Sequence, residues 1–394
     1  MKEQKWSFDE VIDRSETQST KWDYYDKDLL PLWVADMDFR VPQPIINAII
    51  DRAKHGIFGY SYFHSAYFDA VLNWFKRRYN WEIKKQWLAF TPGVIPAINM
   101  AIQSFSNPGD KIIVQNPVYY PFFGAIKNNG RQILHNPLNL INKRYQMDFD
   151  DLKQKIKDPR AKILILCNPH NPVGRVWTRD ELITIGKICI ENEILIISDE
   201  IHCDLIHPGF THTNFANISN EFAMNSITCT SLSKTFNLAG LQLSNIIIPN
   251  QKLRHSFLNH IESVFIPEEF GYLPNDLSLA AFTAAHQHCD EWLNSLLLYL
   301  NENLEFLKSF LKKNLPQIEV IEPEGTYLVW LNFGNLGIEF DKLENFLREK
   351  AKIALDDGSM FGSGGEGFQR INIACPQKTL KKALEQILNA VKEL

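Results

Sequence analysis

The chain has 394 residues, of which 45% are hydrophobic and 22% charged, and its formal net charge is -5. This composition is typical of a globular protein with a core large enough for more than one domain. The net negative charge gives no broad positive field, so it argues against nucleic acids and anionic membranes as partners and favours small-molecule ligands.

The N-terminal segment and the cysteines bear on the compartment. Residues 1–6 carry both charge signs and lead into no apolar run of signal-peptide length, and no run reaches the roughly eighteen apolar residues of a membrane span. The six cysteines are scattered, without CxxC pairs or histidines at zinc spacing. We therefore expect a cytoplasmic protein with buried, reduced thiols and no metal site.

Residues 90–97 predict a loop that enters a helix over Ala97 to Ser106. Backbone N–H groups at the start of a helix bind phosphate, which makes Gly93, Val94 and Ile95 candidates for that role. A single glycine before a helix is more often a plain turn, so a phosphate site here is supported only together with the candidate residues downstream.

Short β-branched runs alternate with amphipathic stretches through the middle of the chain. Continuous apolar strands separated by helices predict an α/β fold with a mostly parallel sheet covered on both faces. The helix expected over 178–192 has its apolar residues on one stripe, and Thr178 caps it ahead of Glu181. The expected strands are 111–114, 162–166, 194–197, 226–229 and 245–248.

A second unit is expected near the C-terminus. Residues 278–315 have helical spacing but are too long for one helix of a compact domain, so we place a domain boundary within them. A strand at 326–331, a helix at 341–350, a strand at 369–373 and a helix at 377–392 then predict a small α+β unit. The expected division is an N-terminal arm with part of the small domain (1–45), a large cofactor-binding domain (46–285) and a small C-terminal domain (286–394).

Three polar residues directly follow predicted strands: Asn168, Asp199 and Ser231. Ligands of open α/β sheets bind beyond the carboxyl ends of the strands, so these residues should converge in space although they are far apart in sequence. A carboxylate at Asp199 ends an apolar run and is costly to bury without a positive partner. A protonated pyridine nitrogen would be such a partner, and a helix N-cap is the alternative role.

The run at 230–241 places Lys234 among hydroxyl residues. A lysine amine can form an imine with a phosphorylated aldehyde, while Ser231 and Ser233 hold its phosphate. For a lone motif of this kind an exposed loop lysine would be the better interpretation. Together with the segments at 167–174 and 198–202, which supply an amide donor and a carboxylate, it resembles the pyridoxal-phosphate (PLP) aminotransferase superfamily of fold type I.

The resemblance implies roles for further residues. It makes Lys234 the residue that carries PLP as an imine and then takes the substrate Cα proton, and it makes Asn171, rather than Asn168, the donor to the cofactor phenolate oxygen. His202 occupies the place where most aminotransferases have a tyrosine on that oxygen, and it is either a donor there or a packed core histidine. Tyr119, rather than Tyr120, matches the residue whose ring lies on the pyridine face, with core packing as the alternative.

Substrate and subunit contacts follow from the same resemblance. Arg370 lies on a strand that is otherwise apolar and matches the arginine that clamps the substrate carboxylate; an internal salt bridge is the alternative. Ala35 and Asn171 join it as substrate-binding residues. Tyr60 resembles a tyrosine that crosses from the neighbouring subunit to the phosphate, which implies a homodimer with shared active sites, whereas its plain interpretation is a surface-loop tyrosine.

Two longer segments, 31–39 and 356–368, resemble the MalY/PatB-type cystathionine β-lyases, and this likeness runs over nearly the whole chain. Most aminotransferases of this fold have an arginine eight residues after the lysine, but Gln242 stands there, a loss that the MalY/PatB branch shares. The resemblance implies elimination of a thiol from L-cystathionine or a related substrate, leaving pyruvate and ammonia. A PLP aminotransferase and a regulatory binding protein that retains the site are the other two hypotheses, because transamination shares the same early steps.

Overall fold

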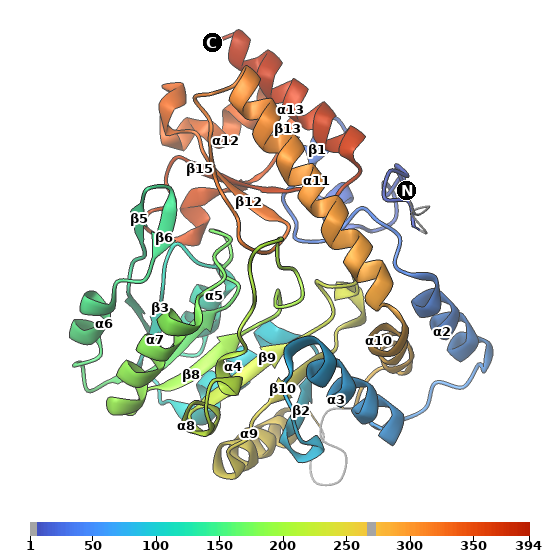
Figure 1. Ribbon diagram of the computed structural model, residues 1–394, viewed down its shortest axis with the longest axis vertical. Helices are drawn as coiled ribbons and strands as arrows, with labels where there is room; N and C mark the ends of the chain where they lie inside the picture. The colour runs from blue at the N-terminus through green and yellow to red at the C-terminus, as the bar shows by residue number, and fades with distance from the viewer. Residues whose placement is uncertain (1–5, 266–272) are drawn as a thin grey trace.

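The computed structural model describes residues 6–265 and 273–394. A seven-stranded sheet with the order β2-β10-β9-β8-β7-β3-β4 forms the lower part of the molecule in Figure 1. Strand β10 runs antiparallel to both of its neighbours, and the other pairs are parallel, so the predicted mostly parallel sheet is confirmed. The strands are β2 (Leu88–Thr91), β3 (Lys111–Val114), β4 (Gln132–His135), β7 (Ala161–Cys167), β8 (Leu195–Asp199), β9 (Ser226–Thr230) and β10 (Ser244–Ile247).

Helices cover both faces of this sheet because its strands are apolar on both sides. Alternate residues of β3 illustrate this: Ile112 and Val114 pack into one hydrophobic cluster, whereas Ile113 packs into another. The first cluster contains α4 (Val94–Phe105), α5 (Pro121–Asn128) and α9 (Gln251–Val264); the second contains α6 (Phe149–Lys155), α7 (Arg179–Glu191) and α8 (Asn220–Met224).

Helix α7 confirms the helix expected over 178–192. The Thr178 side chain accepts a hydrogen bond from the backbone N–H of Glu181, and the Glu181 side chain accepts one from the backbone N–H of Thr178. This reciprocal capping box satisfies N–H groups that have no partner within the helix. The cap therefore explains why α7 begins directly after Thr178.

A second, four-stranded sheet has the order β11-β12-β15-β14 and is antiparallel throughout its printed pairs. Its strands are β11 (Glu319–Ile321), β12 (Leu328–Asn332), β15 (Phe368–Asn372) and β14 (Asp356–Asp357), and α12 (Phe340–Glu349) and α13 (Gln377–Lys392) accompany them. The N-terminal segment reaches this region, because β1 (Leu30–Pro31) pairs with β13 (Ile353–Ala354). The exact domain division given above stays a prediction.

The predicted break within 278–315 is a break between two helices. Helix α10 (Asp276–His288) is followed by the single residue Cys289, after which α11 (Asp290–Asn314) begins and runs alongside α13 to the top of Figure 1. The remaining elements are α1 (Thr20–Asp23), α2 (Gln43–Lys54), α3 (Ser65–Tyr79), β5 (Asn139–Ile141), β6 (Arg144–Gln146) and the short 3-10 helices η1 (Lys85–Trp87), η2 (Phe215–Asn217), η3 (Ala239–Leu241), η4 (Gly334–Leu336) and η5 (Gly358–Phe361).

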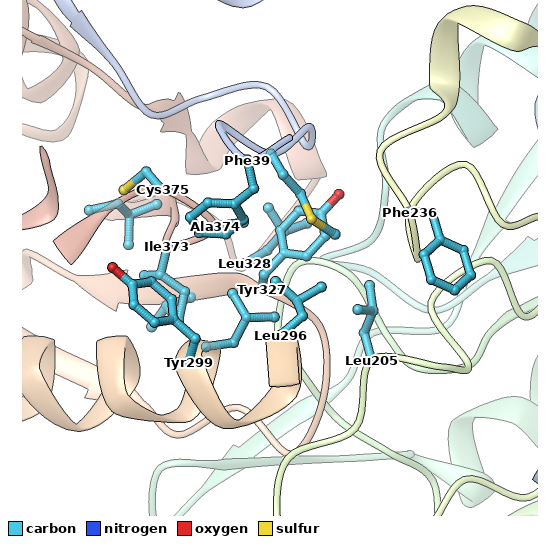
Figure 2. Packing of buried hydrophobic residues seen from close by; sticks show 14 of the residues in the cluster. Phe39, Leu205, Phe236, Leu296, Tyr299, Tyr327, Leu328, Ile373, Ala374 and Cys375 are labelled. Carbon is cyan, nitrogen blue, oxygen red and sulfur yellow. The ribbon is translucent and has the colours of Figure 1, made fainter. Parts of the chain in front are cut away.

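The largest hydrophobic cluster contains residues of the N-terminal segment, of the four-stranded sheet with α11, and of the loop that carries Lys234. Figure 2 shows Phe39 next to Ala374 and Leu328 of the second sheet's region, with Tyr299 of α11 below them and Phe236 at the right of the view. Phe236 lies two residues after Lys234, so this cluster packs the lysine loop into the same core as the N-terminal segment. All six cysteines are buried and free, as the sequence predicts.

Candidate active site

A cavity of about 190 Å³ opens at the carboxyl ends of the parallel strands. It collects the side chains that follow β7, β8 and β9, which run parallel to one another and therefore end at the same edge of the sheet. Eleven of the sequence-predicted site residues line it: Ala35, Gly93, Val94, Ile95, Tyr119, Asn171, Asp199, His202, Ser231, Ser233 and Lys234. Cys167, at the end of β7, and Ile201, two residues after β8, also line it but were not predicted, since such apolar side chains carry no chemical signal.

Lys234 lies in the cavity with its amine held by the main chain of the N-terminal segment. Its Nζ donates a hydrogen bond to the carbonyl oxygen of Ala35 at 2.8 Å, and the Tyr327 hydroxyl donates to the same oxygen at 2.9 Å. Burial, with a further contribution from Arg370, lowers the pKa of Lys234 from 10.5 to about 8. A substantial fraction of this amine is therefore neutral near pH 8, as a nucleophile or proton acceptor requires.

Asp199 is the buried carboxylate at the end of β8. Its Oδ1 accepts a hydrogen bond from the backbone N–H of Ile201 at 3.1 Å, so it also caps the following turn. Burial raises the pKa of Asp199 from 3.8 to about 7, with Glu200 acting in the same direction and Lys234 against it. A carboxylate in this environment gains most from a positively charged partner in the cavity.

Asn171 and Arg370 meet on the side of the second sheet. Arg370 Nη1 donates to Asn171 Oδ1 at 2.9 Å, and its Nη2 donates to the carbonyl oxygen of Trp33 at 3.1 Å and to Asp356. The internal ion pair considered as the alternative role of Arg370 is therefore present. Arg370 is not among the lining residues of the cavity and is linked to it by its hydrogen bond to Asn171. Because Asn171 Oδ1 accepts from Arg370, its Nδ2 donors are left for a ligand.

For two pairs of similar residues close in sequence, only one member of each pair lines the cavity. Asn171 lines the cavity, whereas Asn168 donates from its Nδ2 to the carbonyl oxygen of Thr213 at 3.1 Å. Tyr119 lines the cavity, whereas the Tyr120 ring packs against Phe361 with centroids 5.5 Å apart. Of each pair, the residue chosen by the family resemblance is therefore the one at the cavity, and its role toward a cofactor stays a prediction.

His202 is buried at the cavity wall. Burial lowers its pKa from 6.5 to about 3, with Lys234 and Arg370 adding to the effect, so the imidazole is neutral. Its Nδ1 is buried without a hydrogen-bond partner in the described residues. A buried polar atom of this kind gains from a ligand that can hydrogen-bond to it, which fits the donor role.

The opposite pole of the cavity is built from a helix start and hydroxyl groups. Helix α4 begins at Val94, and Gly93 caps it with a φ of +133° that disfavours any other residue. The Ser231 hydroxyl donates to the carbonyl oxygen of Leu243 at 2.7 Å and accepts from the Ser233 N–H at 3.1 Å. These groups fit a phosphate, which helix N-termini and hydroxyls bind.

Tyr60 is not part of this cavity. It lies between α2 and α3 with 89% of its surface exposed. Exposure agrees with both of its interpretations, a residue that crosses to a neighbouring subunit and an ordinary surface tyrosine.

The residues present fit PLP as a ligand of this cavity. Lys234 offers an amine, Asp199 a buried carboxylate, and the start of α4 a phosphate-binding end, all around one space. No helix among residues 6–265 and 273–394 is long and apolar enough to cross a membrane. In the same residues, no group of three or more His, Cys, Asp or Glu side chains is arranged to hold a metal ion.

Comparisons with known proteins agree with this geometry. The model of the family "Aminotransferase class I and II" matches residues 27–387. Cystathionine beta-lyase PatB of Bacillus subtilis (strain 168) is 42% identical over 390 residues, covering 98% of this chain and 100% of the relative. Protein MalY of Escherichia coli (strain K12) is 32% identical over 394 residues, covering 98% and 99%.

A solved structure extends the likeness to three dimensions. Cystalysin from Treponema denticola, whose crystal structure contains a pyridoxal 5'-phosphate cofactor, superposes with a TM-score of 0.94 at 38% sequence identity and covers 98% of this chain and 99% of its own. The chain belongs to the class I and II aminotransferase family of fold type I, in its MalY/PatB-type branch.

Proposed function

We propose that this protein is a PLP-dependent carbon–sulfur β-lyase that acts on L-cystathionine or a related cysteine S-conjugate. The observation that carries the proposal is the convergence of Lys234, Asp199 and the Asn171–Arg370 pair around one cavity, in a chain 42% identical to PatB over nearly its full length. PLP, when bound, supplies an aldehyde that captures an amine and a ring that accepts the electron pair left at the substrate Cα.

The chain's own residues supply the rest of the chemistry. Lys234 would hold the cofactor through its amine and, when that amine is free, would take the proton from the substrate Cα; its lowered pKa suits both tasks. Asp199 places a carboxylate where a protonated ring nitrogen would neutralise it. Arg370 and Asn171 bind the substrate carboxylate and fix the orientation of the Cα–H bond toward Lys234.

The reaction balances without a second organic substrate. Loss of the Cα proton and of a thiolate from Cβ gives a free thiol and aminoacrylate, and water then converts aminoacrylate to pyruvate and ammonia. An aminotransferase shares the Cα proton removal but retains the substrate's amino group when it releases the first product. It needs a keto acid before it can turn over again.

The two activities differ in one experiment. PLP-loaded protein is mixed with L-cystathionine and no keto acid, and pyruvate, free thiol and ammonia are followed over many turnovers. We expect equal amounts of pyruvate and thiol, released continuously. If product stops at one equivalent per site and resumes only after a keto acid is added, the protein is an aminotransferase instead.

We further propose a homodimer in which Tyr60 reaches the neighbouring subunit's cavity. Its loop carries four exposed apolar or aromatic side chains: Ile57, Phe58, Tyr60 and Tyr62. A concentration of exposed apolar surface on one loop is typical of an interaction site. The loop is held in place by Ser61, whose hydroxyl donates to the carbonyl oxygen of Pro274, and by Arg52, which pairs with Asp276.

Subunit mixing tests this arrangement. Tyr60→Ala and Lys234→Ala should each have severely reduced activity, but a hybrid dimer would contain one site with both native residues. An equal mixture, unfolded and refolded together, should therefore regain about one quarter of the wild-type sites. If hybrid dimers form but no activity is regained, Tyr60 does not contribute to the neighbouring subunit's site and is an ordinary surface residue.

A further inference from the structure

Arg370 already holds a carboxylate of its own chain. Asp356 lies opposite Arg370 in the register of β14 and β15, and both side chains are almost fully buried. They form an ion pair, and the ring of Phe361 covers the guanidinium with its centroid 5.0 Å from Cζ. The substrate clamp is therefore a neutral pair rather than a lone cation.

Two donors of this guanidinium remain for a ligand. A guanidinium has five N–H donors. Asn171, Trp33 and Asp356 accept from three of them, which leaves one N–H on Nη1 and the N–H of Nε. Arg370 Nε is buried without a hydrogen-bond partner in the described residues, so the pair is built to receive another acceptor.

The charge of the incoming group then decides how well it binds. A carboxylate that joins this pair shares one guanidinium with Asp356, so the cluster acquires a net negative charge in a buried site. A zwitterionic amino acid brings an ammonium group that offsets this charge. An α-keto acid brings none. Lys234 is a cation close enough to Arg370 for the two charges to interact, but it would be held by PLP in the loaded protein.

We propose that Asp356 is a specificity-determining residue: by neutralising Arg370, it makes the clamp favour zwitterionic α-amino acids over monoanionic α-keto acids. This inference rests on the proposed function, since it takes the cavity as an amino-acid site. It gives a reason why a keto acid would be a poor second substrate at this site, which favours elimination over transamination.

The test compares two ligands of the same shape that differ in charge. N,N-dimethylglycine is a zwitterion whose tertiary amine cannot bond covalently to PLP, and 3-methylbutanoate is its monoanionic carbon analogue. Calorimetry on the PLP-loaded protein gives the Kd of each. In the wild type we expect 3-methylbutanoate to bind at least about tenfold more weakly.

Two variants isolate the charge of Asp356. Asp356→Asn keeps an oxygen acceptor for Arg370 but removes the charge, so the ratio of the two Kd values should fall by about tenfold and pyruvate should bind more tightly. The matched control is Asp357→Asn, on the same strand, where the carboxylate accepts from Ser359 and Gln369 instead. It should leave the ratio unchanged.

Several outcomes would overturn the inference. Equal Kd values in the wild type would do so without any variant, even if Asp356→Asn failed to fold. Equal weakening of both ligands in Asp356→Asn would make Asp356 a positioning residue only. A protein that discriminates as expected but releases no pyruvate from cystathionine would keep the inference and refute the lyase; an active lyase with a ratio near one would do the reverse.

Discussion

Replacing Asp199 by asparagine tests the electrostatics of the cavity directly, in protein freed of PLP. The folded chain holds the Asp199 pKa at about 7, against 3.8 ordinarily, because the carboxyl is buried. Below pH 3.8 the carboxyl is protonated in both folded and unfolded states, and its burial costs nothing electrostatic. Above pH 3.8 the unfolded chain ionises first, so stability falls as pH rises toward 7.

The size of the effect follows from the shift. One pKa unit corresponds to about 1.4 kcal/mol, so the raised pKa of Asp199 lowers the free energy of unfolding by about 1.5 kcal/mol at pH 5, where only the unfolded chain is ionised, and by about 4 kcal/mol above pH 7. Asp199→Asn does not titrate. Its free energy of unfolding relative to the wild type should therefore rise by about 2.5 kcal/mol between pH 5 and pH 8, whatever constant offset the amide itself introduces.

Urea unfolding of both proteins at several pH values measures this difference. The control is Asp158→Asn, whose carboxylate pairs with Lys111 at the surface and has a lowered pKa, so its effect should be flat over the same range. With PLP bound, the wild type should instead be more stable than Asp199→Asn, because its carboxylate would then have a cationic partner. Parallel stability curves for the wild type and Asp199→Asn would refute the reasoning.

Three further results are expected. Lys234→Ala should show no PLP adduct by mass spectrometry after borohydride reduction, whereas Lys187→Ala on the exposed face of α7 should keep it; an adduct in the first variant would move the attachment site. Gln242→Arg, which adds a cation at the cavity wall, should slow PLP release by about tenfold, and an unchanged release rate would place the phosphate elsewhere. Arg175→Met should lower the free energy of unfolding by about 2–3 kcal/mol because it removes the buried one of the two arginines that pair with Glu324 and leaves only Arg144, while Arg160→Met at the surface should change it by less than about 0.5 kcal/mol; equal effects would contradict the role given to the buried pair.

Much of the cavity could be predicted because its residues follow parallel strands. Asp199 ends β8, Ser231 directly follows β9, and Asn171 lies in the turn that begins with Asn168 after β7; strands that run the same way present their ends at one edge of the sheet. Each apolar run is long enough to be recognised on its own. The sheet therefore brings the three together without any knowledge of the helices between them.

The Asp356–Arg370 pair could not be predicted in the same way. Strand β14 has only two residues, and its register against β15 depends on the loop that joins them. A two-residue strand has no periodicity to read, so nothing in the sequence distinguishes Asp356 from Asp357 as the buried partner. The sequence predicted a break within residues 278–315, but its position at Cys289 could not be predicted, because no proline or glycine marks the junction of α10 and α11.

The N-terminal segment links the amine and the clamp, which the sequence separates by 136 positions (370 minus 234). The Asn372 Nδ2 donates to the carbonyl oxygens of Val34 and Asp36 at 2.7 and 2.6 Å, and Asn237 exchanges hydrogen bonds with both main-chain groups of Met37. One of these amides lies two residues after Arg370 and the other three residues after Lys234. The carbonyl of Ala35 that meets the lysine is therefore placed from both sides, so a shift of either element would move the acceptor of the catalytic amine. This shared support explains how residues from three distant parts of the chain can hold one geometry for the substrate Cα.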